Sequence, residues 1–161
     1  KKLLYFLGNK KGTHMQNFDD DELDELYQSL IFEHSKKPYN FKKISHCNCS
    51  QIGKNPSCGD KLEIFVNINQ NKIQDISFIG EGCALSMASA SFLMKKIEHL
   101  SLEEAKSMIN RFIEFILNKG NLIDSDEPLH LFYNVNKFPL RVKCVLLSWR
   151  TMEKILLDTD K

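Results

Sequence analysis

The chain has 161 residues, with 22 Lys and Arg against 21 Asp and Glu and a formal net charge of +1. This balance argues against a protein whose main task is to bind nucleic acid, because such proteins need a basic surplus. Apolar residues make up 42% of the chain, enough to fill a core. The longest apolar runs, such as Leu3–Leu7, fall far short of the about 20 residues of a membrane span. We therefore expect no nucleic-acid partner and no membrane association.

Residues 1–14 resemble a targeting signal only superficially. Lys1 and Lys2 precede the run Leu3–Leu7, but a secretory signal needs about 7 or more apolar residues and a cleavage site with small residues. The stretch Gly12–Met15 is typical of an expression-tag junction, with Met15 as the native start. We expect residues 1–14 to be an expression-derived or flexible N-terminal segment and residues 15–161 to form a single domain. Without an export signal, the expected location is cytoplasmic.

Hydrophobic periodicity predicts the first elements in chain order. Leucines recur at helical spacing between Asp20 and His34, which predicts a helix there. Residues 38–60 are interrupted by Pro, Gly and Asn, so we expect a loop with a short strand near 41–44. Residues 61–68 and 73–79 alternate between apolar and polar on either side of a turn. This alternation predicts an antiparallel hairpin.

The second half of the chain is predicted to be helical. The expected elements are a helix over 86–99, a helix over 101–118 that opens with a capping box, a short helix near 129–133 in an irregular segment, and a last helix over 140–157. Elements in this order predict an α+β fold, in which a small antiparallel β-sheet of about three strands packs against several α-helices.

Five cysteines are present, and an odd number in a cytosolic chain is poor support for a disulfide framework. Thiols that cluster in such a chain are more often metal ligands or reactive sulfur. Cys58, Cys83 and Cys144 each lie where the chain turns beside a regular element. Cys83 and Cys144 are expected at the starts of helices, where the helix dipole favours the thiolate, so both should ionise more easily than an ordinary thiol.

Asp60 follows Cys58 by two residues. Three thiolates and one carboxylate are a donor set that suits Zn²⁺ or an iron–sulfur cluster. The separations of 25 residues (58 to 83) and 61 residues (83 to 144) are not those of a zinc finger. Read from the spacing alone, the pattern is more often explained by three unrelated thiols, two of them buried at helix starts as small hydrophobic residues. His46, Cys47 and Cys49 form a second group, either a labile metal site or free loop thiols.

Three separated motifs resemble the IscU/NifU N-terminal family of iron–sulfur cluster assembly proteins. They are Asn55–Asp60, Phe78–Ser91 and Arg141–Trp149, and the resemblance extends from about residue 20 to 154. Within the family the chain is similar to the SufU branch. Lys143 stands where scaffold-type members have a His before the third Cys, and the stretch between the second and third Cys is long.

The resemblance implies both a site and an activity. In the SufU branch the three Cys and the Asp of the Cys-Gly-Asp motif bind zinc, which carries over to Cys58, Asp60, Cys83 and Cys144. The catalytic residue is then Cys58. It accepts persulfide sulfur from a PLP-dependent, SufS-type cysteine desulfurase, after a His of that enzyme replaces Cys58 on the zinc.

Two alternatives remain open. The same four residues could hold iron or a [2Fe–2S] cluster, as a scaffold that assembles the cluster and transfers it. The chain could also be a zinc-stabilised binding module without chemistry. If the chain accepts sulfur or assembles a cluster, we expect its further partners to be downstream iron–sulfur assembly proteins.

Overall fold

The structure is a computed structural model that describes residues 4–8, 13–17, 20–123, 126 and 128–161. Its contacts divide the chain into two units, residues 1–30 and 31–161, which are described separately. The first unit holds an antiparallel hairpin of β1 (Leu4–Gly8) and β2 (Thr13–Asn17), together with the start of α1 (Asp20–Lys36). The predicted helix is therefore confirmed. The origin of residues 1–14 and the single domain over 15–161 stay predictions.

The second unit is built on a three-stranded antiparallel sheet. Its strands are β3 (Cys49–Asn55), β4 (Asp60–Asn69) and β5 (Lys72–Glu81), in the order β3-β4-β5. The predicted hairpin is β4 and β5. Its turn residues Gln70 and Asn71 have φ of 49° and 57°, as in the turns that match the twist of a tight hairpin.

Strand β3 corrects the prediction of a loop over 38–60. No strand forms over 41–44, where Phe41 makes only an isolated bridge to Phe78. β3 forms instead over 49–55, at the edge of the sheet, and its one apolar side chain in mid-strand, Ile52, is exposed. Backbone pairing with β4 holds such a strand, so hydrophobic alternation does not reveal it.

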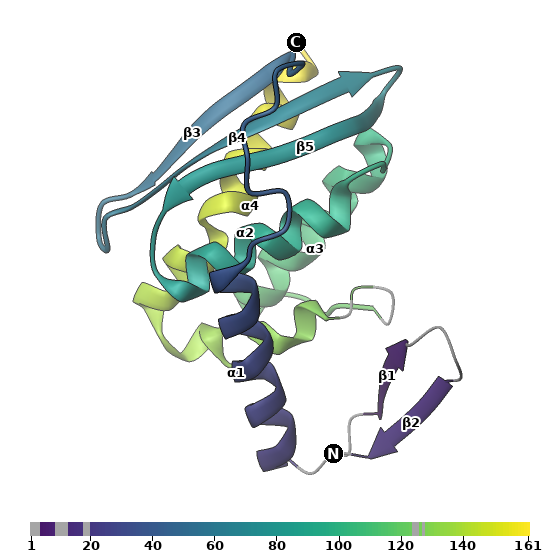
Figure 1. The fold of residues 1–161 in the computed structure, drawn as a ribbon, viewed down its shortest axis with the longest axis vertical. Coiled ribbons are helices and arrows are strands. Elements are labelled where there is room, and N and C mark those ends of the chain that lie inside the picture. Colours follow the sequence, from purple (N-terminus) through teal and green to yellow (C-terminus); the bar gives the residue numbers. More distant parts are fainter. Residues whose placement is uncertain (1–3, 9–12, 18–19, 124–125, 127) are drawn as a thin grey trace. The chain divides into compact units, whose positions relative to one another are not determined.

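Three helices cover one face of the sheet: α2 (Ala84–Ile97), α3 (Leu102–Ile116) and α4 (Pro139–Thr159) (Figure 1). Segment 37–48 crosses the other face, where Lys43 lies over the ring of Phe65. The core is mainly aliphatic and includes an aromatic contact between helices, in which Phe112 of α3 stacks on Trp149 of α4 with ring centroids 4.0 Å apart. This arrangement confirms the predicted α+β architecture. No helix among the described residues is long and apolar enough to cross a membrane.

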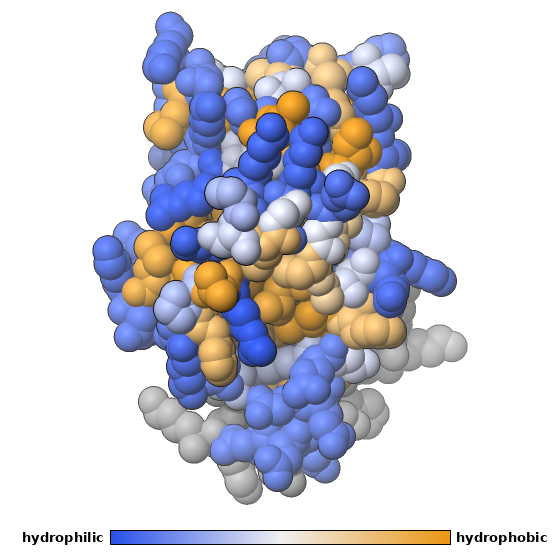
Figure 2. Space-filling model, turned by 90° about the vertical axis from the view of Figure 1, so that its left-hand side faces the viewer, coloured by the Kyte–Doolittle hydropathy of each residue, from blue (hydrophilic) through white to orange (hydrophobic). Residues whose placement is uncertain are grey.

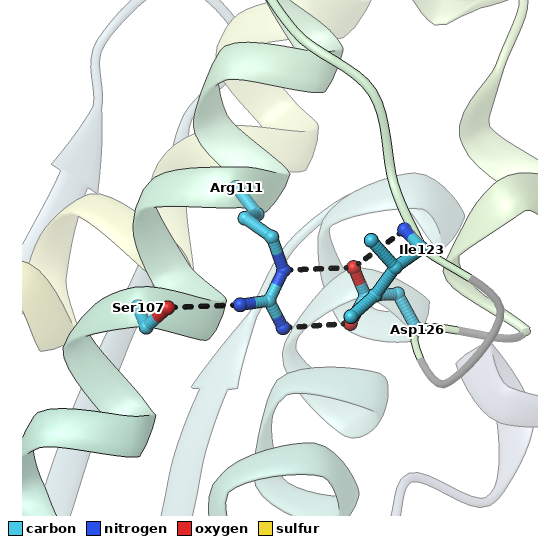
Figure 3. Close-up of polar contacts among 4 residues, drawn as sticks. All are labelled: Ser107, Arg111, Ile123 and Asp126. Atoms are coloured by element: carbon cyan, nitrogen blue, oxygen red, sulfur yellow. Dashed lines mark hydrogen bonds and ion pairs between the residues drawn. The ribbon is translucent and has the colours of Figure 1, made fainter.

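The described part of segment 117–138, which connects α3 to α4, includes the short 3₁₀ helices Leu129–Phe132 and Val135–Lys137. The first confirms the short helix predicted near 129–133. The segment is anchored by Asp126, whose carboxylate accepts two hydrogen bonds from Arg111, at 3.0 and 2.9 Å, and one from the Ile123 N–H (Figure 3). Arg111 also donates to the Ser107 hydroxyl. Burial on its own raises the pKa of Asp126, but these bonds outweigh it and hold the pKa below the usual value.

Candidate metal centre

Three parts of the fold bring the four predicted site residues together: the β3–β4 turn with the start of β4, the start of α2 and the start of α4. Cys58 lies in the turn between β3 and β4, and Asp60 is the first residue of β4. Cys83 is the N-cap of α2, and Cys144 lies in the second turn of α4. The site therefore depends on the sheet and both helices being packed against one another.

The side chains lie within contact distance. The Cys58 sulfur is 2.8 Å from Oδ2 of Asp60 and 3.2 Å from the Cys144 sulfur. One donor atom from each of these three residues lies within 4.8 Å of the others. The Cys83 sulfur lies 3.7 Å from Oδ2 of Asp60 but is not part of this group of three. All four predicted residues thus converge on one small region.

The local backbone explains why Cys58 and Asp60 point the same way. At the end of β3 the carbonyl of Asn55 accepts hydrogen bonds from the N–H groups of Gly59, at 2.9 Å, and Cys58, at 3.3 Å. Gly59 has φ of +74°, a conformation that costs glycine little. The turn reverses the chain within four residues, so that Cys58 projects over the first residue of β4.

Asp60 is the buried anchor of the site, with 2% of its surface exposed. Its Oδ1 accepts a hydrogen bond from the Cys83 N–H at 2.9 Å. Gly82 leaves room for this contact, since a β-carbon there would lie 2.8 Å from Oδ1. Burial raises the pKa of Asp60, but hydrogen bonds from the Cys58 thiol, the Cys83 N–H and the other two thiols bring it below its usual value.

Cys144 corrects a prediction. Its position near the start of α4 was expected to ease ionisation, but its pKa is raised well above the usual value. Burial is the largest cause, followed by hydrogen bonding to Cys58, Cys83 and Asp60. The second turn of a helix lacks the free N–H groups that favour a thiolate in the first, so desolvation dominates.

Cys83 and Cys144 are held in place by a link between their helices. The Ser89 hydroxyl of α2 donates to the Val145 carbonyl of α4 at 2.6 Å, and it accepts from the indole N–H of Trp149 at 2.9 Å. All three groups are buried. Because hydrogen bonds in a dry core are directional and costly to break, this link fixes the spacing of the two helix starts.

Sequence reasoning gave no role to Asn55, which the structure places beside the sulfurs. Its Nδ2 lies 2.9 Å from the Cys58 sulfur and 3.7 Å from the Cys144 sulfur. The available signal was its position, three residues before Cys58 in a tight turn.

The second cysteine group lies away from the candidate site. Cys49, at the start of β3, pairs with Val66, whereas Asn55, at the end of β3, pairs with Asp60. The six residues of strand from Cys49 to Asn55 span about 20 Å.

The donor set fits a zinc ion. Zinc prefers four ligands in a tetrahedron, and Zn–S bonds of about 2.3 Å place neighbouring sulfurs about 3.8 Å apart. The separations of 2.8 and 3.2 Å from the Cys58 sulfur to Asp60 and Cys144 need only small outward shifts to match. The Cys83 sulfur, 3.7 Å from Asp60, lies outside this group of three and would have to move toward it. If all four side chains were ionised with no cation bound, their negative charges would repel one another strongly. Such a cluster of acidic groups is typical of a metal-binding site.

Comparison with known proteins shows which family shares these features. The family model described as the NifU-like N terminal domain matches residues 26–127. The chain is 36% identical over 134 residues to the zinc-dependent sulfurtransferase SufU of Bacillus subtilis, covering 82% of this chain and 90% of that protein. It is 32% identical over 136 residues to the iron–sulfur cluster assembly scaffold protein IscU of Streptococcus pyogenes, covering 84% and 85%.

Solved structures agree with the sequence relatives. A crystal structure from Fervidobacterium islandicum, of a protein described as an iron–sulfur cluster assembly scaffold for the SUF system, superposes with a TM-score of 0.77 at 34% identity, covering 82% of this chain and 97% of that one. A NifU-like protein from Brucella abortus has the same TM-score at 14% identity, covering 86% and 96%, which shows the shared fold. The chain therefore belongs to the IscU/NifU-like family of iron–sulfur cluster assembly proteins, which includes the SufU branch.

Proposed function

We propose that this protein accepts sulfur as a persulfide on Cys58 from a SufS-type cysteine desulfurase, with zinc held by Cys58, Asp60, Cys83 and Cys144. The observation that carries the proposal is the unequal exposure of the four residues. Cys58 is exposed, Cys83 is half-buried, and Asp60 and Cys144 are buried. One sulfur is thus accessible to a partner, while the other ligands are anchored in the protein.

A zinc ion bound here would keep the thiols deprotonated at neutral pH. Asp60, Cys83 and Cys144 would hold it, and Cys58 would be the ligand that leaves when the partner docks. The Cys58 thiolate then attacks the outer sulfur of the desulfurase persulfide. A new S–S bond forms on Cys58, the old S–S bond breaks, and the desulfurase cysteine leaves as a thiolate. The step needs no oxidant, because a persulfide is consumed and another is made.

The surroundings of Cys58 support contact with a partner. Lys143 donates to the Ser57 hydroxyl at 3.4 Å, which places a positive charge beside the turn. At the start of α4, Phe138 and Leu140 are exposed, by 46% and 66%, and the Arg141 guanidinium lies over the Phe138 ring. Figure 2 shows the face that carries these elements, with an apolar area at mid-height between hydrophilic side chains. Apolar and arginine side chains of this kind are common in protein interfaces.

The second candidate function is a scaffold for a [2Fe–2S] cluster on the same residues. It is favoured by the relatives from S. pyogenes and F. islandicum, both described as assembly scaffolds. Three thiolates and one carboxylate are also a suitable donor set for such a cluster. A zinc-stabilised binding module remains as the third alternative.

The decisive experiment combines metal analysis with persulfide detection. The purified protein is mixed with a SufS-type desulfurase and cysteine, and the sulfur on each Cys is mapped by mass spectrometry. We expect one zinc per chain, a persulfide on Cys58 and faster desulfurase turnover. C58A should keep zinc more weakly and lose the stimulation, whereas C49A should keep both.

Other outcomes overturn the proposal. A coloured protein with a cluster absorption band after reconstitution, and no persulfide, would establish the scaffold. Zinc that does not exchange, with no effect on the desulfurase, would establish the binding module. Normal stimulation by C58A after loss of all zinc would exclude both the proposed nucleophile and the proposed ligand set.

A further inference from the structure

Asn55 is a buried polar residue next to the proposed site, with 5% of its surface exposed. The carboxamide has a defined orientation. Its Oδ1 accepts a hydrogen bond from the Ser57 N–H at 3.2 Å, and a backbone N–H can only donate. The oxygen must therefore face Ser57, which leaves the NH₂ group facing the sulfurs.

The NH₂ group contacts two sulfurs unequally. Nδ2 lies 2.9 Å from the Cys58 sulfur, a full hydrogen bond, and 3.7 Å from the Cys144 sulfur, a weaker one. The other contacts of the Cys58 sulfur are the carboxylate of Asp60 and the thiol of Cys144. The carboxylate accepts from the Cys58 thiol, and in the sulfur–sulfur contact either atom can be the donor. The Asn55 NH₂ group can only donate, so it is a fixed hydrogen-bond donor to the Cys58 sulfur.

The negative charge of the proposed site explains why a hydrogen-bond donor is needed beside Cys58. Three thiolates and a carboxylate carry four negative charges, and a zinc ion neutralises only two. Buried excess charge must be met by hydrogen-bond donors around the ligands. The Ser86 N–H serves the Cys83 sulfur, and the Cys83 N–H serves Asp60. For Cys58 this donor is the Asn55 side chain.

We propose that Asn55 is a positioning residue for sulfur transfer, whose amide N–H holds the Cys58 sulfur at the exposed rim of the site, in the orientation in which it receives sulfur. The proposal rests on the proposed function. Asn55 does not touch the incoming sulfur; it acts through Cys58. Asn55 contacts the sulfur of Cys58, which we propose to react, more closely than the sulfur of Cys144, which we propose to stay on the metal.

Cobalt substitution tests the contact directly. Co²⁺ replaces zinc in tetrahedral thiolate sites and gives a sulfur-to-metal charge-transfer band, whose energy rises when an N–H donor stabilises the sulfur electrons. In N55L, of similar size but without a donor, we expect one cobalt per chain and a band shifted to longer wavelength. The same change at Asn48, before the other end of β3, is the control and should leave the band unchanged.

Kinetics test the positioning role. With the desulfurase as the varied substrate, N55L should lower kcat for sulfur acceptance at least about tenfold and change KM less than twofold. N55D keeps the acceptor for the Ser57 N–H and the size of the side chain, but faces the sulfurs with a carboxylate. It should bind cobalt more weakly than N55L, because a like charge then lies beside the thiolates.

Several results would overturn the proposal: an unshifted cobalt band in N55L, equal changes in kcat and KM, or tighter metal binding by N55D than by N55L. The outcome is separable from the proposed function. If the wild type accepts no sulfur, the proposed function fails, while the cobalt band still reports whether Asn55 donates to Cys58.

Discussion

Trp149 donates its indole N–H to the hydroxyl of Ser89 at 2.9 Å, in a fully buried contact between α4 and α2. The same hydroxyl donates to the Val145 carbonyl, one residue after Cys144. Because Cys83 caps the start of α2, this contact sets the distance between two of the four site residues. Stability of the core and geometry of the site are therefore coupled.

Removing the Ser89 hydroxyl should lower both the stability of the protein and its affinity for zinc. S89A leaves the indole N–H of Trp149 without a partner in a dry core and removes the cross-helix bond to the Val145 carbonyl, so we expect the free energy of unfolding to fall by about 1–3 kcal/mol. Urea unfolding of the metal-free protein measures this change, and zinc affinity should fall in parallel. S45A, at an exposed loop position, is the control and should change neither. An unaltered unfolding midpoint in S89A would show that the link is energetically neutral.

Gly82 should be needed for the position of the Asp60 carboxylate. In G82A the new β-carbon would lie 2.8 Å from Oδ1 and 3.0 Å from Cγ of Asp60, which forces the carboxylate to move. We expect zinc affinity to fall by at least about tenfold, since a displaced ligand loses most of its bond to the metal. Competition with a chromophoric chelator measures the affinity. E81A changes the exposed neighbour and should bind zinc like the wild type; equal affinities for G82A and the wild type would contradict the prediction.

The ion pair between Arg111 and Asp126 should give the stability an acid dependence. The pKa of Asp126 is lowered in the folded state, so its contribution is complete above the unfolded value of about 3.9. That contribution is lost as the pH falls through the folded pKa. D126N should therefore be less stable than the wild type by about 1–3 kcal/mol at pH 7, and the difference should shrink below about pH 4.

Urea unfolding at several pH values checks this prediction. D158N removes an exposed carboxylate that pairs with Lys161 at the chain end, and it should cost less than about 1 kcal/mol at any pH. A difference between the wild type and D126N that stays constant down to pH 3 would show that Asp126 acts without its charge.

Zinc should stabilise the folded protein by binding at the candidate site and not at the group of His46, Cys47 and Cys49. At a free zinc concentration one hundred times Kd, ligand linkage adds about 2.7 kcal/mol. We expect zinc to raise the Tm of the wild type and of C49S, but not of C144S. Thermal unfolding with and without zinc measures the effect. A loss of the zinc response in C49S would move the metal to the group of His46, Cys47 and Cys49.

Local patterns predicted most elements because their signals are local. The capping box at Ser101 and Glu104 forms as expected, and the alternation over 61–68 becomes β4. β3 was missed because its stability comes from pairing with β4 and from packing on α4. A β-carbon at Gly53 would collide with Thr151 of that helix, a constraint that depends on residues nearly one hundred positions away.

In the candidate site, too, the features that depend on tertiary packing could not be predicted from local sequence. Spacing alone favoured three unrelated thiols, and the grouping of Cys58, Asp60, Cys83 and Cys144 came from the family resemblance. The ionisation of Cys144 was predicted with the wrong sign, because its burial is set by tertiary packing. Asn55 had no signal beyond its place in a turn, since its contacts with the Cys58 and Cys144 sulfurs depend on how the turn and a distant helix pack together.

The last helix supplies Cys144, and this has a consequence during protein synthesis. Cys58, Asp60 and Cys83 are translated first, and Cys144 follows 61 residues after Cys83. At about 5–20 residues per second, the ribosome needs about 3–12 s to add it. Throughout that interval the nascent chain offers an incomplete set of donors and no closed core around them. The full set of proposed donors thus exists only once the ribosome has added Cys144.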